Sequence, residues 1–267
     1  MSPKIRTALI CVFSAALLFC MARAALILYS YISAAKLYKD LSGRVFAASP
    51  LPEPDSGTDG PSEETPAAPE LPDRENIYID FDTLIQENPD CVAWLWIPAL
   101  DIKYPIMQSD DNREYLTTAF DGSYSACGSL FLDYRNKPDL TSSHSIIYGH
   151  NMYDGSMFGR LDAYADEEFF SANPDIYVFT PEGREIYQVF SHYITTEEHD
   201  SYRMEFESES GLADYARILK RYSWLDSDVE LRNISRMLTL STCVDDNSKR
   251  RVVHALLVCS EVKTLKP

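Results

Sequence analysis

The sequence lacks the glycine-rich motifs with which many enzymes bind nucleotides. Neither the phosphate-binding loop pattern nor the dinucleotide-binding pattern occurs among its 267 residues. It also has no C-x-x-C pair and no histidine at the spacing of a metal ligand. These absences argue against chemistry built on a nucleotide or a bound metal, so we expect neither a cofactor nor a metal ion.

Basic residues are scarce. The chain has 24 Lys and Arg against 41 Asp and Glu, a formal net charge of -17. Nucleic-acid phosphates require basic patches, so this balance argues against a nucleic-acid partner. Six cysteines are present, but Cys11 and Cys20 lie in an apolar N-terminal run, and the rest do not form a disulfide framework. We expect one free reactive thiol, Cys243, and three structural cysteines, Cys91, Cys127 and Cys259.

An almost uninterrupted apolar run covers residues 8–32. At about 1.5 Å per residue, a helix of this length roughly spans the ~30 Å hydrocarbon core of a membrane. Arg23 lies beyond its middle, from where its side chain can reach the headgroups. Ala22-Arg23-Ala24 also fits a signal-peptide cleavage site, but the apolar run continues to Tyr29 and favours an uncleaved anchor. We predict a membrane anchor and juxtamembrane segment over residues 1–46; the charges on its two sides leave its orientation open.

Residues 47–75 differ sharply in composition. Seven of the fifteen prolines fall between Pro50 and Pro72, among acidic and small polar residues, and no aromatic residue accompanies them. Such a segment buries too little apolar surface to offset its ordering entropy. We predict a disordered linker that would reach roughly 70 Å if extended.

Residues 76–267 are numerous enough for one well-buried domain. An amphipathic helix is predicted over 79–88, and apolar residues at helical spacing predict a longer one over 209–225. Short apolar runs separated by Gly, Pro, Asn and Asp predict a mainly β fold, a barrel or sandwich. The expected strands are 92–97, 102–107, 129–133, 145–148, 176–180, 186–195, 237–241 and 252–262.

The best candidate for a reactive group is Cys243. It ends the apolar run from Met237, and a polar loop separates it from a second run that opens with Arg250 and Arg251. Two strands and a tight loop would bring the thiol and a guanidinium to one reacting group. Most free cysteines are buried small hydrophobes, but a nearby cation draws a thiol toward the reactive thiolate.

A nucleophilic thiol needs a proton-transferring partner, which is usually a histidine supplied by the fold. His150 follows an apolar run that breaks at Gly149, and the ends of strands commonly carry catalytic groups. The other histidines are weaker candidates: His144, His192, His199 and His254. Ser241 and Thr242 are candidates for lining the cleft, although a strand cap also explains them. Asp245 is a candidate for orienting the histidine, although an exposed loop carboxylate is the favoured explanation.

Together these segments resemble class B sortases, the membrane-anchored cysteine transpeptidases of Gram-positive bacteria. The resemblance rests on Thr239-Leu240-Ser241-Thr242-Cys243, Tyr148-Gly149-His150-Asn151-Met152 and the arginine that opens the next strand. It extends over residues 79–262 and includes Asn88-Pro89-Asp90, Trp96-Ile97-Pro98, Tyr104-Pro105-Ile106, Gly128-Ser129-Leu130-Phe131-Leu132-Asp133 and Asp154-Gly155-Ser156-Met157-Phe158-Gly159.

The resemblance implies a closed β-barrel with a long helix inserted among its late strands. It also implies a cytoplasmic N-terminus, an extracellular catalytic domain, and catalytic roles for His150, Cys243 and one arginine. Alternation along a strand puts Arg250 on one face and Arg251 on the other, and the family pattern favours Arg250, although Arg251 stands where the family has an apolar residue.

The expected reaction is transpeptidation of surface proteins or pilins. Cys243 would attack the carbonyl of a threonine in a C-terminal sorting signal, His150 would protonate the departing amine, and Arg250 would stabilise the oxyanion. An amine from a cell-wall peptidoglycan precursor or a pilin lysine would then resolve the thioester. A secreted cysteine hydrolase acting on peptidoglycan and a non-enzymatic surface-binding module are the alternatives.

Overall fold

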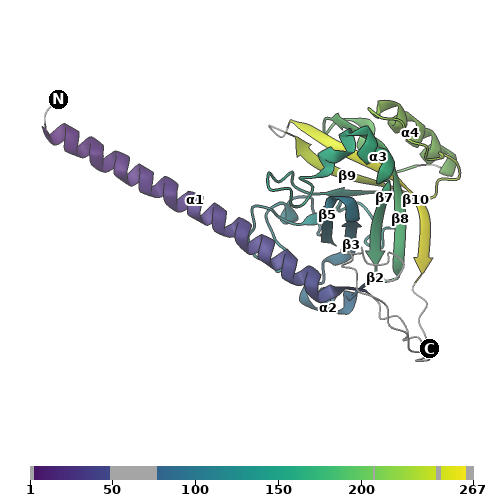
Figure 1. The fold of residues 1–267 in the computed structure, drawn as a ribbon, viewed down its shortest axis with the longest axis horizontal. Coiled ribbons are helices and arrows are strands. Elements are labelled where there is room, and N and C mark those ends of the chain that lie inside the picture. The colour runs from purple at the N-terminus through teal and green to yellow at the C-terminus, as the bar shows by residue number, and fades with distance from the viewer. Residues whose placement is uncertain (1–2, 49–76, 207, 245–247, 263–267) are drawn as a thin grey trace, which may run out of the picture.

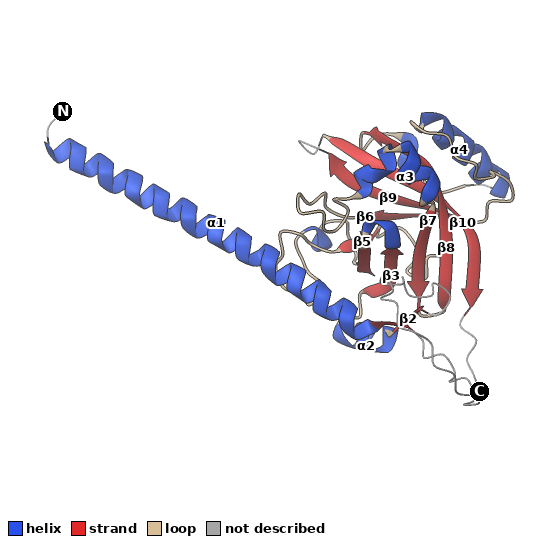
Figure 2. Cartoon of the chain, in the orientation of Figure 1, coloured by secondary structure: helices blue, strands red, loops and turns tan. Residues whose placement is uncertain are grey.

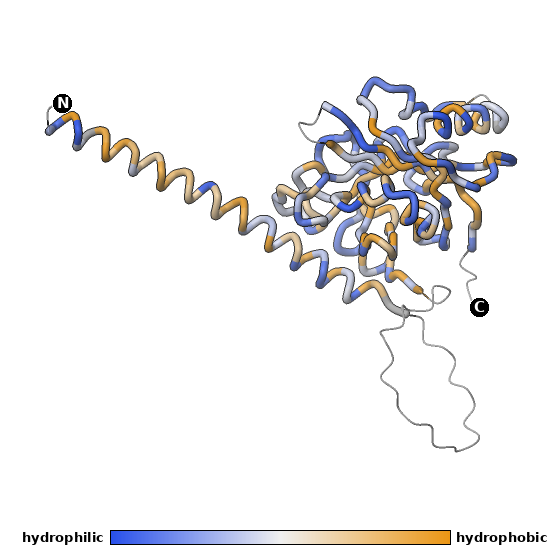
Figure 3. Tube along the Cα trace, turned by 45° about the horizontal axis from the view of Figure 1, so that its top comes forward, coloured by the Kyte–Doolittle hydropathy of each residue, from blue (hydrophilic) through white to orange (hydrophobic). Residues whose placement is uncertain are grey.

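A computed structural model describes residues 3–48, 77–206, 208–244 and 248–262. Its first element is a long helix, α1 Pro3–Val45, of 43 residues. Figure 1 shows most of α1 projecting away from the rest of the chain, with only its C-terminal end against the domain. Figure 3 shows the projecting part as predominantly hydrophobic. Within the described residues, α1 is the one helix long and apolar enough to cross a membrane.

The helix extends to Val45, well past the predicted apolar span, and these last turns pack on the domain. Ala34, Tyr38, Leu41 and Val45 recur every three or four residues and are buried, so one stripe of the helix faces the barrel. Arg44 also forms an ion pair with Glu87. The C-terminal turns of α1 therefore pack directly against the domain.

The two short strands after α1 were not predicted. β1 Phe46–Ala48 pairs antiparallel with β2 Ile77–Ile79, so Ala48 lies opposite Ile77. The predicted linker, residues 47–75, lies almost wholly outside the described residues. Because its flanking strands are paired, the chain returns to the point from which it leaves α1.

The predicted closed β-barrel is confirmed. Around the barrel the strands run β10-β8-β7-β3-β4-β5-β6-β9, and β9 pairs with β10 to close it (Figure 2). The pairs β4–β5 and β6–β9 are parallel and the others antiparallel. Closure leaves no free sheet edge in the barrel. The strands are β3 Cys91–Ile97, β4 Ile102–Met107, β5 Leu130–Leu132, β6 His144–Tyr148, β7 Asp175–Thr180, β8 Gly183–Thr195, β9 Met237–Val244 and β10 Lys249–Val262.

Both predicted helices of the domain are present, as α2 Phe81–Glu87 and α4 Glu209–Tyr222. Each begins at a residue whose side chain caps it: Asp80 accepts from the Thr83 backbone N–H and Ser208 from that of Gly211. The short α3 Glu167–Ala172 was not predicted. Short 3-10 helices complete the fold: η2 Pro98–Leu100, η3 Glu114–Leu116, η4 Leu161–Ala165 and η5 Asp200–Tyr202.

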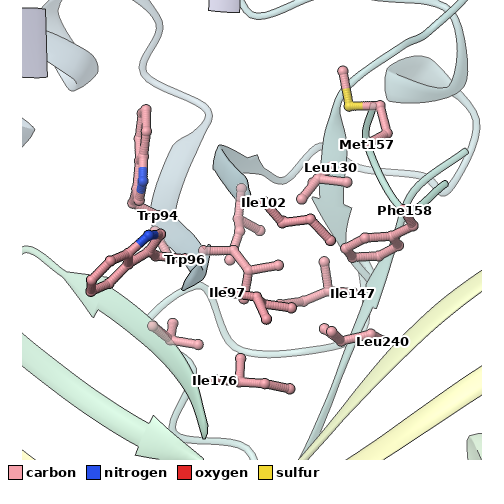
Figure 4. Close-up of a cluster of buried hydrophobic side chains, with 14 of the residues drawn as sticks. Trp94, Trp96, Ile97, Ile102, Leu130, Ile147, Met157, Phe158, Ile176 and Leu240 are labelled. Atoms are coloured by element: carbon pink, nitrogen blue, oxygen red, sulfur yellow. The ribbon is translucent and has the colours of Figure 1, made fainter. Parts of the chain in front are cut away.

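Inward-facing side chains fill the barrel, and a second cluster lies beneath α4. Figure 4 shows Ile97, Ile102, Ile147, Phe158 and Leu240 converging from different strands and loops. The α4 cluster joins that helix to the outer face of β8 and β10. It contains Phe190, Leu212, Tyr215, Leu219 and Val252. The apolar stripe of α4 therefore packs against the barrel, as its helical spacing predicts.

Candidate active site

Cys243 lies on β9 directly opposite Arg250 on β10. Directly opposed residues of an antiparallel pair point to the same face of the sheet, so thiol and guanidinium share one side. Thr242 and Arg251 form the next pair and share the other side. The strand parity predicted for the two arginines is therefore present in the structure.

The parallel pairing of β6 with β9 brings His150 to the same place. Tyr148 lies opposite Ser241, and the Gly149 backbone N–H donates to the Ser241 carbonyl oxygen at 3.2 Å. Two residues further along the two chain segments come His150 and Cys243. Gly149 is required at this step, because a Cβ there would lie 2.4 Å from Leu130 Cδ2 and 2.8 Å from Phe158 Cδ2.

The imidazole of His150 is held by a backbone carbonyl. Its Nε2 lies 2.8 Å from the Leu116 carbonyl oxygen, at the end of η3. A carbonyl oxygen only accepts hydrogen bonds, so Nε2 carries a hydrogen in this arrangement. The neutral ring then has its lone pair on Nδ1, which is left for proton transfer.

These three side chains line one cleft of about 410 Å³. Ser241 and Thr242, which were also predicted, contribute to its wall. The Ser241 hydroxyl lies 3.0 Å from the hydroxyl of Tyr202, whose ring is stacked against that of Tyr148. The wall also includes residues that the sequence did not single out as site residues: Asn112, Leu116, Phe131, Arg135, Tyr148, Glu197 and Tyr202.

The charge environment of the thiol differs from the expected one. Burial raises the pKa of the Cys243 thiol above its ordinary value, so the resting thiol is protonated at neutral pH. Arg250 forms an ion pair with Glu197, whose side chain is 66% exposed while that of Arg250 is 16% exposed. The guanidinium is thus paired with an exposed carboxylate at the mouth of the cleft, and burial is what raises the pKa of the neighbouring thiol.

Comparison with known proteins places this site in a family. A model of the sortase domain matches residues 95–258. Sortase B of Staphylococcus aureus is 32% identical over 188 residues, which cover 69% of this chain and 77% of that protein. Sortase B of Listeria monocytogenes is 37% identical over 174 residues, which cover 64% of this chain and 71% of that protein. The chain belongs to the class B sortases.

Solved sortase B structures share the fold. A Staphylococcus aureus sortase B–substrate complex is 32% identical, with a TM-score of 0.62 over 67% of this chain and 84% of that one. The Bacillus anthracis sortase B in complex with AAEK1 is 29% identical, with a TM-score of 0.68 over 87% of this chain and 99% of that one. As a sortase, the chain is a cysteine transpeptidase of surface proteins.

The other residues weighed as site candidates lie outside this cleft or outside the described residues. Arg251 points away from the thiol, and its Nη1 lies 2.8 Å from Nε2 of the buried His192. Asp245 lies outside the described residues. His199 lies 2.6 Å from the Ser201 hydroxyl.

Two further histidines are wholly buried and joined through Thr239. His144 Nε2 lies 2.6 Å from the Thr239 hydroxyl, and that hydroxyl lies 2.7 Å from His254 Nδ1. His254 Nε2 in turn lies 3.0 Å from the Tyr193 hydroxyl. Burial lowers the pKa of His144 to about 4 and that of His254 well below its ordinary value. Both are neutral core residues, in agreement with their low ranking as catalytic candidates.

All six cysteines are free. Cys91 and Cys127 are buried, as expected for structural residues, whereas Cys259 is only half-buried, on β10. Among the described residues, no group of three or more His, Cys, Asp or Glu side chains is arranged to hold a metal ion.

Proposed function

We propose that this sortase is a single-pass membrane enzyme that cleaves a C-terminal sorting signal after a threonine and transfers the acyl group to a cell-wall or pilin amine. The observation that carries the proposal is the meeting of Cys243, His150 and Arg250 in one cleft. A thiol, a proton-transferring group and a permanent cation are the three components that acyl transfer from a peptide requires.

In the first half-reaction, His150 Nδ1 takes the proton of the Cys243 thiol as the sulfur attacks the threonine carbonyl carbon. The new S–C bond forms, the peptide C–N bond breaks, and the same imidazole delivers the proton to the departing amine. While the sulfur attacks and before the C–N bond breaks, Arg250 exchanges its Glu197 partner for the substrate carbonyl oxygen and stabilises the negative charge that develops there. In the second half-reaction an amine acceptor attacks the thioester carbonyl carbon. The new C–N bond forms, the S–C bond breaks, and the imidazole returns the amine's proton to the Cys243 sulfur, which releases the new amide.

The proposed membrane location is supported by α1, and the proposed orientation by membership of the sortase family. The apolar part of α1 spans the membrane, the N-terminus is cytoplasmic, and the barrel is extracellular, where surface proteins and cell-wall amines are found. Solved sortase B structures include a substrate complex and a complex with a peptide of three glycines, which supports a peptide donor and an amine acceptor for this relative.

The test uses the full chain in lipid nanodiscs with a library of internally quenched pentapeptides that share a fixed threonine. Triglycine is present in one arm and absent in the other. A transpeptidase gives a triglycine adduct at the threonine, whereas a hydrolase gives cleavage alone in both arms. A binding module gives neither product, and either of these last two results would overturn the proposal.

A further inference from the structure

The juxtamembrane end of α1 contributes a buried tyrosine to the domain. Tyr38 is 5% exposed, and its ring packs edge-on against Tyr104 with 5.3 Å between the ring centroids. Its hydroxyl donates to the Gly128 carbonyl oxygen at 2.8 Å and lies 2.8 Å from the Ser129 hydroxyl. A helix that served only as a tether would not need a polar group at this depth.

Gly128 and Ser129 hold the segment that carries η3. The Ser129 backbone N–H donates to the Tyr115 carbonyl oxygen at 2.9 Å, and its hydroxyl donates to the Thr118 carbonyl oxygen at 2.8 Å. Gly128 has a φ of +56°, and a Cβ there would lie 2.4 Å from the Tyr115 oxygen and 2.7 Å from the Leu116 oxygen. The two backbone segments are therefore in direct contact, and a shift of one moves the other.

The Leu116 carbonyl oxygen is the group that holds His150 Nε2 at 2.8 Å. A short path of contacts therefore runs from Tyr38 through Gly128 and Ser129 to Leu116 and the imidazole. We propose that Tyr38 is a positioning residue for His150, so that the juxtamembrane end of the anchor helix forms part of the active-site scaffold. This inference rests on the proposed catalytic role of His150.

The juxtamembrane part of α1 contacts the domain over only part of its length. A cavity of about 450 Å³ lies between the helix and the domain, and its lining includes Tyr31, Tyr38 and Tyr104. The helix is therefore not close-packed along its whole juxtamembrane length. Tyr31 lines the same cavity from the same helix and is not one of the residues that form this path, which makes it a matched control.

The test compares Tyr38→Phe with Tyr31→Phe in the full chain in nanodiscs, using the library peptide that is cleaved fastest. Tyr38→Phe keeps the ring that packs on Tyr104 and removes only the hydroxyl. We expect kcat to fall about tenfold with KM changed less than about twofold, because small displacements of a catalytic group are costly even when substrate contacts are intact. Tyr31→Phe should leave both constants within about twofold of wild type.

A second readout separates positioning from simple stabilisation. The ¹⁵N shifts of the His150 ring should report the Nε2–H tautomer in the wild type and a mixture of tautomers in Tyr38→Phe. A wild-type kcat with an unchanged tautomer, or an equal loss in Tyr31→Phe, would overturn the inference. His150→Ala is measured alongside. If it is inactive while Tyr38→Phe behaves as wild type, only the positioning role fails; if it retains activity, the proposed catalytic role fails instead.

Discussion

Cys243 and Arg250 are directly opposed residues on β9 and β10, and both side chains line the same cleft. Their spacing is set by the ladder of backbone hydrogen bonds between the two strands, and side chains at directly opposed positions have Cβ atoms only about 5 Å apart. The sheet therefore keeps a cation beside the Cys243 thiol.

This pairing predicts different effects for the two adjacent arginines. Arg250→Ala should lower kcat/KM by about a hundredfold or more, the size expected for loss of one group that stabilises an oxyanion. Arg251→Ala should cost less than about tenfold, because that side chain faces His192 on the opposite side of the sheet. Steady-state kinetics on folded protein measure both. A larger loss in Arg251→Ala would assign the catalytic role to that residue and contradict the observed register.

Removal of the thiol should abolish turnover and leave the fold intact. Cys243→Ala deletes one half-buried sulfur at the end of a strand, which contributes little packing, so the thermal midpoint should change by a few degrees at most. Cys259→Ala is the matched control, since it removes another half-buried thiol from β10. Product formation above a few per cent of wild type in Cys243→Ala would exclude this residue as the nucleophile.

Substitution of His150 should remove activity, whereas substitution of His254 should lower stability. His150→Ala should be nearly as inactive as Cys243→Ala with a midpoint close to wild type. His254→Ala should lose on the order of 2–4 kcal/mol of stability, because it empties a fully buried site and removes one hydrogen-bond partner from each of the Thr239 and Tyr193 hydroxyls. Its kcat per folded molecule should stay within about threefold of wild type. Equal losses of kcat at the two positions would contradict their assignment.

The barrel strands were predictable from the sequence because each is an apolar run bounded by turn residues. β4 Ile102–Met107 matches its predicted range at both ends. β1 and β2 were missed because each has three residues and lies beside the predicted linker, and α3 was missed because six residues make fewer than two helical turns. The long C-terminal extension of α1 was missed because its apolar residues are sparse there and become meaningful only against the barrel.

The site was predictable where it lies on strands. Alternation along β10 separated Arg250 from Arg251, and the break at Gly149 singled out His150. Leu116 ends the short helix η3 and Glu197 lies in a loop, and no periodicity relates either of them to the thiol, so only the folded chain reveals them. The raised pKa of the Cys243 thiol and the Glu197 partner of Arg250 could not be predicted, because burial and ion pairing are properties of the fold rather than of local sequence.

The buried histidines predict that stability falls in mild acid. Burial lowers the pKa of His144 and of His192 to about 4 and that of His254 well below its ordinary value. In the unfolded chain these groups titrate near about 6.5, so below that pH the unfolded state binds protons that the folded state does not. The stability they provide is complete above about pH 6.5 and is lost progressively as the pH falls toward 4.

Each of the three histidines should lower the free energy of unfolding by about 1.4 kcal/mol as the pH falls from about 7.5 to 5.5. These losses should add where the sites are independent. Thermal midpoints measured across this range on the full chain in nanodiscs check the slope. His254→Gln, which removes one titrating group, should show a shallower decline than wild type although its midpoint at neutral pH is lower. Parallel pH profiles for the two proteins would mean that His254 is already charged in the folded state, which its burial between Thr239 and Tyr193 argues against.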